Sequence, residues 1–378
     1  MSGIGKEHDM NSIERFYATV ERRPVDRPAF WLGMPSQGAV PGLCAYFGAS
    51  NIDELKRTCG DDLYAVEVPY RSPHCSALYA AFDWYMNGSD VDTEHRTLTA
   101  KGFFAGMESV GEAEKAGFPW PDPAMYIDPG ECRRIVDEAP KDKAVLGMVW
   151  ACHFQDFCAA FGMEDAMVNM LAAPELVHYV DGRIMGFYLK ALEIFLEATR
   201  GKLHAILIGD DMGSQLDLML SLEHVKEFVI PGAKALIDLA HGYGVKVVYH
   251  SCGSIWRAVP ALIEAGADVI HPIQAKAAGM APGELRARYG AAVSFCGGVD
   301  TQELLPNGSP AQVAEAVKCL RELFPTGLII SPSHEALLPD VPPANIEAMF
   351  AECGVCAKNE SENAPNHKPN AGQSIKQQ

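Results

Sequence analysis

The sequence contains no apolar stretch near the roughly 18 to 20 residues that a membrane-spanning helix needs, because Gly, Pro or a charged residue interrupts every apolar run. No basic segment followed by an apolar run and a small-residue cleavage site opens the chain. Its eleven cysteines are odd in number and irregularly spaced, unlike those of a disulfide framework. We therefore expect a cytoplasmic protein with mostly free thiols and no membrane contact.

Positive charge is also scarce in this chain. Lys and Arg total 31 against 49 Asp and Glu, which gives a formal net charge of −18. A chain this acidic repels phosphate backbones, so the composition argues against nucleic acid as a partner. The 378 residues are 48% hydrophobic, which excludes disorder throughout and allows two average domains or one large single-core fold.

Apolar runs of strand length alternate with longer amphipathic stretches from about residue 28 to residue 355. This rhythm predicts parallel strands, buried on both faces and joined by helices. A doubly wound sheet is disfavoured because no GxGxxG or P-loop motif is present. We therefore predict an α/β fold, a (β/α)8 TIM barrel, over residues 1–356. The predicted strands are Pro28–Gly33, Asp62–Pro69, Ala144–Ala151, His204–Asp210, Val245–His250, Asp268–Gln274, Ala292–Gly298 and Leu328–Ser331. The clearest predicted helices are Pro174–Thr199, Leu222–Tyr243, Ile255–Ala265, Pro310–Phe324 and Asn345–Glu352.

Two segments depart from the barrel rhythm. Val91–Val110 alternates polar and apolar residues around Lys101 and Gly102, which predicts an inserted β-hairpin that serves as a lid or as the contact of a homodimer. Residues 357–378 are rich in Asn, Gln, Ser and Lys and nearly free of large apolar side chains. Such a segment cannot offset its ordering entropy, so we expect a disordered tail.

Polar residues gather just past the predicted strands. In a closed barrel the carboxyl ends of all strands converge on one rim, where active sites of this architecture lie. We therefore expect the functional groups to come from these positions, which are Glu67, Asp210, Asp211, His250, Cys252, Gln274, Asp300 and His334.

The pair His250 and Cys252 follows the fifth predicted strand. On an extended segment two residues this far apart point to the same side, so an imidazole and a thiolate can hold one Zn2+ ion. The third ligand of an open catalytic site has to come from elsewhere on the rim; His334 is the first candidate and Cys296 the second. Taken alone, His-x-Cys more often marks a hydrogen-bonded His beside a packed Cys; its place at the rim favours the metal site.

Adjacent carboxylates end the fourth predicted strand. Burial of Asp210 or Asp211 at a barrel mouth is costly unless the group binds something, so we expect one of them, with Gln215, to orient substrate or to act in acid–base chemistry. The alternative for Asp211 is a helix N-cap.

Five motifs occur in the order typical of one family. They are Arg23-Pro24-Val25-Asp26-Arg27-Pro28, Asp210-Asp211-x-Gly213-x-Gln215, His250-Ser251-Cys252-Gly253, Gly297-Gly298-Val299-Asp300, and Ser331-Pro332-Ser333-His334 followed by Pro342-x-x-Asn345-Ile346. Through them residues 12 to 352 resemble the uroporphyrinogen decarboxylase superfamily, especially its corrinoid-dependent branch of methylcobamide:coenzyme M methyltransferase-like proteins. The resemblance implies a (β/α)8 barrel with its site at the carboxyl rim.

The resemblance also implies a chemistry. The decarboxylase's early arginine signature is replaced here by residues 33–38, Glu67 stands where its strand-two Asp is expected, and His153 lies near the position of its catalytic Tyr. The methyltransferase branch binds zinc through His-x-Cys and a later Cys, and this chain has His334 at that last position. The resemblance thus implies a zinc site of His250, Cys252 and His334, with Glu67, His153, Gln274 and Asp300 around the substrate.

In that branch zinc holds a small acceptor thiol as thiolate, which takes a methyl group from a corrinoid. This chain lacks the corrinoid-binding pattern Asp-x-His-x-x-Gly, so a corrinoid would arrive on a partner protein. Two alternatives stay open: a metal-free carboxy-lyase that uses Asp210 or Asp211 with His334 as acid, and a corrinoid or tetrapyrrole binding protein without turnover.

Overall fold

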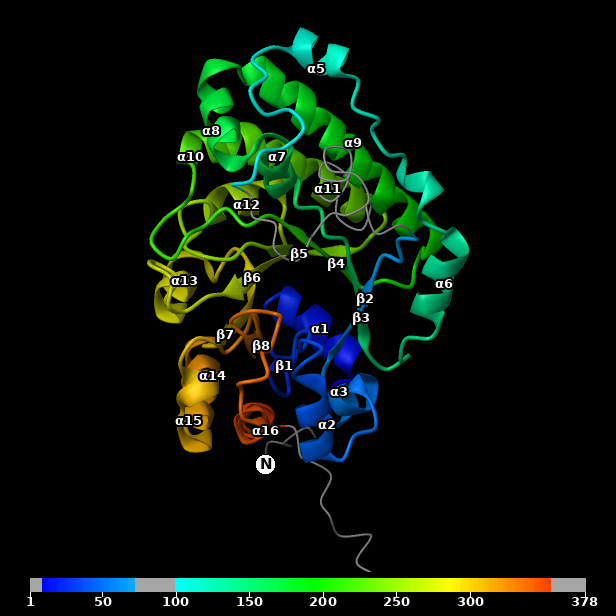
Figure 1. The fold of residues 1–378 in the computed structure, drawn as a ribbon. Coiled ribbons are helices and arrows are strands. Elements are labelled where there is room, and N and C mark those ends of the chain that lie inside the picture. The colour runs from blue at the N-terminus through cyan, green and yellow to red at the C-terminus, as the bar shows by residue number, and fades with distance from the viewer. Residues whose placement is uncertain (1–8, 72–98, 355–378) are drawn as a thin grey trace, which may run out of the picture.

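A computed structural model describes residues 9–71 and 99–354 (Figure 1). Eight parallel strands form one sheet in the order β1-β8-β7-β6-β5-β4-β3-β2, with helices around it. The predicted (β/α)8 TIM barrel is confirmed, and each strand falls within one residue of a predicted apolar run. The strands are β1 (Ala29–Phe30), β2 (Leu63–Glu67), β3 (Ala144–Met148), β4 (Ala205–Gly209), β5 (Lys246–His250), β6 (Val269–Ile273), β7 (Ser294–Val299) and β8 (Leu328–Pro332).

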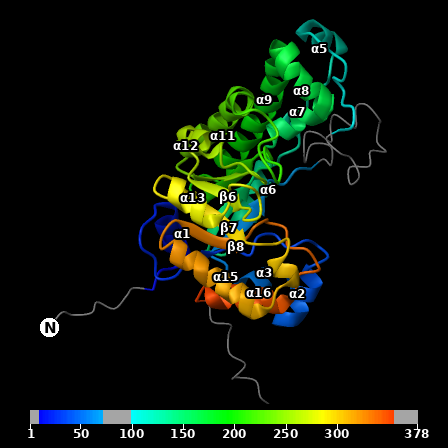
Figure 2. The same ribbon diagram turned by 90° about the vertical axis from the view of Figure 1, so that its left-hand side faces the viewer.

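Most of the described helices begin where the sequence supplies a Pro or a capping side chain; α7, α8 and α14 have neither at their own first residues. Five of the helices start with a proline at their first position, where its missing N–H costs nothing. Figure 2 shows α5, α7, α8 and α9 grouped at the opposite end of the molecule from α2, α3 and α16. The helices are α1 (Ser12–Val20), α2 (Val40–Phe47), α3 (Ile52–Cys59), α5 (Val110–Ala116), the 3-10 turn η2 (Pro123–Met125), α6 (Pro129–Asp137), α7 (His153–Phe161), α8 (Met163–Ala172), α9 (Pro174–Ala198), α10 (Leu222–His224), the π-turn η3 (Val225–Val229), α11 (Ile230–Gly242), α12 (Val259–Ala265), α13 (Pro282–Tyr289), α14 (Leu304–Asn307), α15 (Pro310–Leu323) and α16 (Pro343–Glu352).

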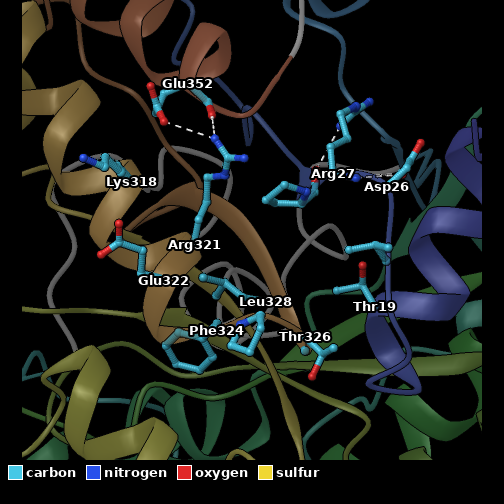
Figure 3. A pocket seen from close by; sticks show the side chains of 14 residues that line it. Thr19, Asp26, Arg27, Lys318, Arg321, Glu322, Phe324, Thr326, Leu328 and Glu352 are labelled. Atoms are coloured by element: carbon cyan, nitrogen blue, oxygen red, sulfur yellow. Dashed lines mark hydrogen bonds and ion pairs between the residues drawn. The ribbon is translucent and has the colours of Figure 1, made fainter. Parts of the chain in front are cut away.

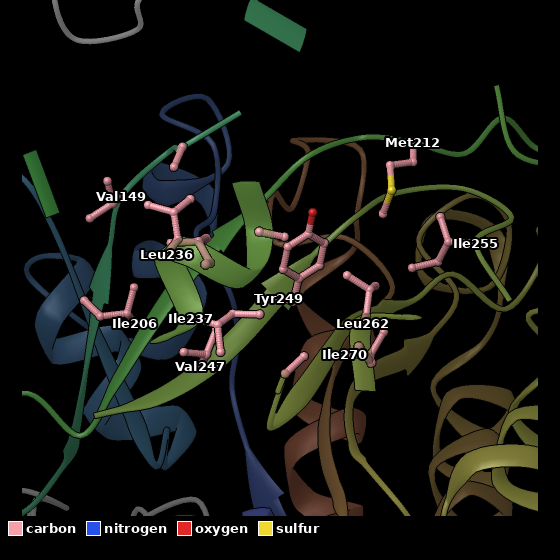
Figure 4. Packing of buried hydrophobic residues seen from close by; sticks show 14 of the residues in the cluster. Val149, Ile206, Met212, Leu236, Ile237, Val247, Tyr249, Ile255, Leu262 and Ile270 are labelled. Carbon is pink, nitrogen blue, oxygen red and sulfur yellow. The ribbon is translucent and has the colours of Figure 1, made fainter. Parts of the chain in front are cut away.

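Two apolar layers hold the barrel together. The inner layer fills the barrel with side chains such as Trp31, Leu207 and Val248. The outer layer packs the other face of the strands against the helices, as Val247 and Leu236 do in Figure 4. Because both faces are buried, the strands read as continuous apolar runs rather than as alternating ones.

The strands β1 and β2 are the two edges of the sheet, and a buried carboxylate joins them; we call this junction the barrel seam. No ladder joins these two strands in the described part of the chain, and the Asp62 N–H donates to the Phe30 carbonyl over 2.9 Å. The Phe30 N–H donates back to the Asp62 carboxylate, also over 2.9 Å. Arg15 and Arg27 pair with the same buried carboxylate at 2.7 and 2.8 Å. The motif that contains Asp26 and Arg27 therefore closes the barrel.

The predicted hairpin Val91–Val110 is not extended in its described part. Residues 99–106 form turns, and α5 begins at Val110. Phe104 is buried against Phe118 and Trp120, and its N–H donates to the Ala160 carbonyl. The alternation on which the hairpin prediction rests lies in residues 93–99, nearly all outside the described part, so the structure tests the prediction only over residues 99–110, where the chain forms turns and then α5. Residues 91–98 and the predicted tail 357–378 lie outside the described residues.

Within the described residues, no helix combines the length and the apolar character needed to cross a bilayer.

Candidate functional site: a His-Cys-Asp cluster at the rim

The loops that follow β4 and β5 pack tightly against each other. Gly253 adopts a left-handed φ of +83°, and a Cβ there would lie 2.3 Å from the Gly213 carbonyl oxygen. The Ser254 N–H donates to the Ser214 carbonyl over 2.7 Å. Only glycine allows this approach, which brings the residue after β4 next to the residues after β5.

Three metal-binding side chains meet at this contact. His250 ends β5, and its Nε2 lies 3.6 Å from Cys252 Sγ and 3.3 Å from Asp211 Oδ1. The Cys252 N–H donates to the same Asp211 oxygen over 2.8 Å, so the backbone fixes the carboxylate in place. The donor atoms of all three residues lie within 4.8 Å of one another. The structure thus joins His250 and Cys252, as predicted from their spacing, with one carboxylate of the Asp pair.

The charges of this cluster shift its pKa values in opposite directions. Burial works against the charged form of Asp211, but the hydrogen bonds from His250 and the Cys252 N–H, together with the charges of His250 and His334, outweigh burial and hold the pKa of Asp211 below its ordinary value. Burial likewise works against protonation of His250, yet Asp211, Cys252 and the charge of Glu335 raise its pKa well above the ordinary value. The negative charges of Asp211 and Glu335 thus favour a positive charge at His250.

His334, Glu335 and His271 surround the cluster from β8 and β6. A hydrogen bond to Cys252 raises the pKa of His334, and the His334 ring centroid lies 6.4 Å from that of His250. Glu335 Oε2 lies 3.6 Å from His250 Nδ1. His271 Nδ1 lies 2.9 Å from His250 Nδ1, and burial lowers the pKa of His271 well below the ordinary value.

A family model described as uroporphyrinogen decarboxylase (URO-D) matches residues 130–354, which is more than half of the chain. The chain belongs to the URO-D family. The resemblance predicted from the motifs is therefore confirmed. No curated protein matches the sequence of this URO-D family member at a significant level.

Solved structures are similar to it in fold. A methyltransferase from Methanosarcina mazei is 16% identical, with a TM-score of 0.66 and coverage of 91% of this chain and 98% of that one. At this identity the likeness shows a shared fold. Xylanase B from Clostridium stercorarium F9 is 9% identical, with a TM-score of 0.38 and coverage of 59% and 83%, and we conclude nothing from it.

Asp210 and His153 lie behind the rim of this URO-D barrel. The fully buried Asp210 carboxylate accepts the Phe154 and Gln155 N–H groups at 2.9 and 3.0 Å, so it caps α7. Burial raises the pKa of Asp210 to about 6. His153 is buried between Asp181 at 3.0 Å and Asp210 at 3.4 Å. Burial opposes its protonation, but these carboxylates raise the pKa of His153 to about 9. The helix-capping role that the sequence allowed for Asp211 is therefore played by Asp210. The side chains of Asp210 and His153 are both buried and do not face a solvent-accessible site.

Of the remaining predicted residues, two lie near the cluster and two do not contribute to it. Gln274 accepts the Gly253 N–H and so supports the loop of Cys252. Glu67 accepts the indole N–H of Trp150 over 3.2 Å in a cavity of about 490 Å3, and the Trp150 ring lies 6.2 Å from His250. Gln215, in contrast, is exposed in its loop. The Asp300 carboxylate is occupied by the three N–H groups of residues 302–304.

Cys296, the second candidate for a third ligand, packs in the inner apolar layer. Burial raises the pKa of its thiol, and its Sγ is in neither of the two groups of neighbouring donor atoms found among the described residues. His271 and Glu335 were missed by sequence reasoning. The signal for Glu335 was its position directly after His334. His271 stands in the predicted strand Asp268–Gln274, two residues from Val269, which faces the barrel interior.

A second cavity of about 470 Å3 lies at the opposite end of the barrel, before β1 and β8 (Figure 3). Two of the charged groups that line it are arginines already paired: Arg27 with Asp62, and Arg321 with Glu352. Catalytic sites of this fold lie at the carboxyl ends of the strands, so we assign this cavity no part in the chemistry.

Proposed function

We propose that this protein is a zinc-dependent methyltransferase that moves a methyl group between a protein-bound corrinoid and a small thiol or similar acceptor. The observation that carries the proposal is the cluster of Asp211, His250 and Cys252 at the rim. Membership of the URO-D family and the fold shared with a methyltransferase support it.

The separations within the cluster fit a tetrahedral zinc site. Zn–N and Zn–S bonds of about 2.0 and 2.3 Å imply ligand atoms about 3.5 Å apart for a His–Cys pair and about 3.4 Å for a His–carboxylate pair. The corresponding separations here are 3.6 Å and 3.3 Å. These two separations are the ones that such a site needs, and they support the proposal. His334, the third ligand that the sequence predicts, hydrogen-bonds Cys252, but it is not among the three residues whose donor atoms lie within 4.8 Å of one another.

Each residue has a distinct part in this proposal. Bound zinc would supply a Lewis acid that lowers the pKa of an acceptor thiol. Asp211, His250 and Cys252 would hold the ion, and the negative charges of Asp211 and Cys252 would offset its positive charge. Glu67 and Trp150 line a cavity that could receive an acceptor, and the Trp150 ring relates this cavity to the cluster, since its centroid lies 6.2 Å from that of His250. The corrinoid would be brought by a partner protein, because the chain lacks a corrinoid-binding motif.

The cellular setting is part of the same proposal. The cysteines of the described residues are all free, in keeping with the cytoplasm predicted from the sequence. A homodimer and the absence of nucleic acid partners likewise stay predictions from the sequence.

The decisive experiment mixes the zinc-loaded protein with methylcobalamin and a series of small thiols and follows the cobalamin absorption spectrum. We expect thiol-dependent demethylation that disappears after zinc is removed and returns when zinc is restored. A Cys252→Ser variant should be inactive, while Cys319→Ser, which changes an exposed thiol, should match the wild type. No demethylation with any thiol, together with release of carbon dioxide from a carboxylated substrate, would instead establish the carboxy-lyase.

A further inference from the structure

The strand register places two imidazole rings side by side. His250 on β5 pairs with His271 on β6, and the Ser251 N–H donates to the His271 carbonyl over 2.8 Å. Both side chains are buried, and their ring centroids lie 5.0 Å apart. Backbone pairing thus holds the two rings in a fixed relation.

The contact between the rings has the geometry of a hydrogen bond. His250, His271 and Glu335 also place one donor atom each within 4.8 Å of one another, so the length of the contact has to distinguish a hydrogen bond from a shared metal ion. Two imidazole nitrogens bound to one tetrahedral zinc would be about 3.3 Å apart. The Nδ1 atoms of His250 and His271 are only 2.9 Å apart, which is the usual length of a hydrogen bond. One of these two nitrogens therefore carries a proton and the other accepts it.

The other ring nitrogen of His250, Nε2, indicates which of the two Nδ1 atoms carries the proton. His250 Nε2 faces Cys252 Sγ and Asp211 Oδ1, so it needs a free lone pair to bind a metal. With a metal bound, Nε2 no longer carries the proton that it shares with Asp211 in the metal-free protein, so the one proton of the neutral ring lies on Nδ1, which donates a hydrogen bond to His271. Glu335 Oε2 competes poorly for this proton, because it lies 3.6 Å from His250 Nδ1. His271 then carries its own proton on Nε2, a buried nitrogen that has no hydrogen-bond partner among the described residues; the centroids of the His271 and Trp31 rings lie 5.4 Å apart.

We propose that His271 is a positioning residue. Its Nδ1 accepts a hydrogen bond from His250 Nδ1–H and thereby keeps His250 Nε2 oriented toward the metal. This inference rests on the proposed zinc site. Hydrogen-bond partners of metal-bound histidines fix the tautomer and the ring orientation, and their loss typically weakens metal binding about 10- to 100-fold.

The test compares two replacements of His271 by their affinity for Zn2+, measured by competition with a chromophoric chelator. Asn places an acceptor near the position of Nδ1, so His271→Asn should bind zinc within about threefold of wild type, whereas His271→Leu should lose about 10- to 100-fold. His178→Leu, a change at an exposed histidine, is the control. The absorption spectrum of bound Co2+ reports ligand geometry independently of activity.

The outcomes separate this inference from the proposed function. Equal zinc affinity of His271→Leu and wild type would overturn the positioning role. Equal losses in His271→Asn and His271→Leu, accompanied by equal losses of stability, would also overturn it, because a packing role predicts that result. Failure of the wild type itself to bind zinc would overturn the metal site on which the inference depends.

Discussion

Asp210 and Asp211 are neighbours in the chain, yet their carboxylates serve different parts of the molecule. Asp210 is buried and accepts two N–H groups at the start of α7. Asp211 approaches His250 Nε2 and accepts the Cys252 N–H. Successive side chains of an extended segment point to opposite sides, so one carboxylate supports the barrel wall and the other reaches the rim.

This division predicts opposite effects of two matched substitutions. Asp211→Asn should weaken Zn2+ binding by at least about tenfold and leave stability nearly unchanged. Asp210→Asn should lower the free energy of unfolding by about 1–2 kcal/mol through the weakened cap, with little effect on zinc affinity. Chelator competition and urea unfolding measure the two effects. The assignment fails if the Asp210 variant is the one that loses metal.

Replacing the thiol of the cluster should remove the metal. Cys252→Ser should bring the zinc content, measured by atomic emission after zinc supplementation, far below that of wild type, because Ser is a poor ligand for this ion. Cys319→Ser should keep the wild-type content, since Cys319 is exposed on α15. A wild-type protein with well under one equivalent of zinc would contradict the site.

Removing the carboxylate at the barrel seam should destabilise the fold. Asp62→Asn breaks buried pairs with Arg15 and Arg27 and should lower the free energy of unfolding by about 3–5 kcal/mol. Asp238→Asn breaks an exposed pair with Lys234 and should cost less than about 1 kcal/mol. Urea midpoints compare the two variants, and equal midpoints would rule out the seam as a source of stability.

Acid should weaken the same end of the barrel through Asp26. Burial alone would raise the pKa of Asp26, but hydrogen bonds from Arg15 and from the Met10 and Arg27 N–H groups outweigh it and lower the pKa from 3.8 to about 2. The group therefore contributes stability above pH 3.8, and this contribution is lost as pH falls through 2. The gap in urea midpoint between wild type and Asp26→Asn should shrink from pH 5 toward pH 2, whereas a constant gap would contradict the shift.

The strands and the His-Cys pair follow from local sequence. A strand buried on both faces has to be apolar throughout, so its run is visible in the sequence, and the residue that ends the run is known to within a position. His250 and Cys252 lie two apart at the end of such a run, and this spacing alone places them on one side. For that reason the barrel and the centre of the candidate site were predictable.

Other features depended on contacts between distant segments. The hairpin predicted for Val91–Val110 extends into residues 99–106, but there the chain forms turns, and Phe104 lies against α7 with its N–H donated to the Ala160 carbonyl. Asp300 follows a strand, as the site residues do. Its carboxylate, however, accepts hydrogen bonds from the N–H groups of the turn that follows it and so stabilises that turn.

By itself, the sequence determined the order of strands and helices and the residues that end each strand, since these depend on local patterns of burial. Only the tertiary structure decided that Asp211 rather than Asp210 joins His250, and that His271 lies beside it. The register between β4, β5 and β6 and the approach of Gly213 to Gly253 set those neighbours. Such relations are set by packing among segments far apart in the chain, which no local pattern encodes.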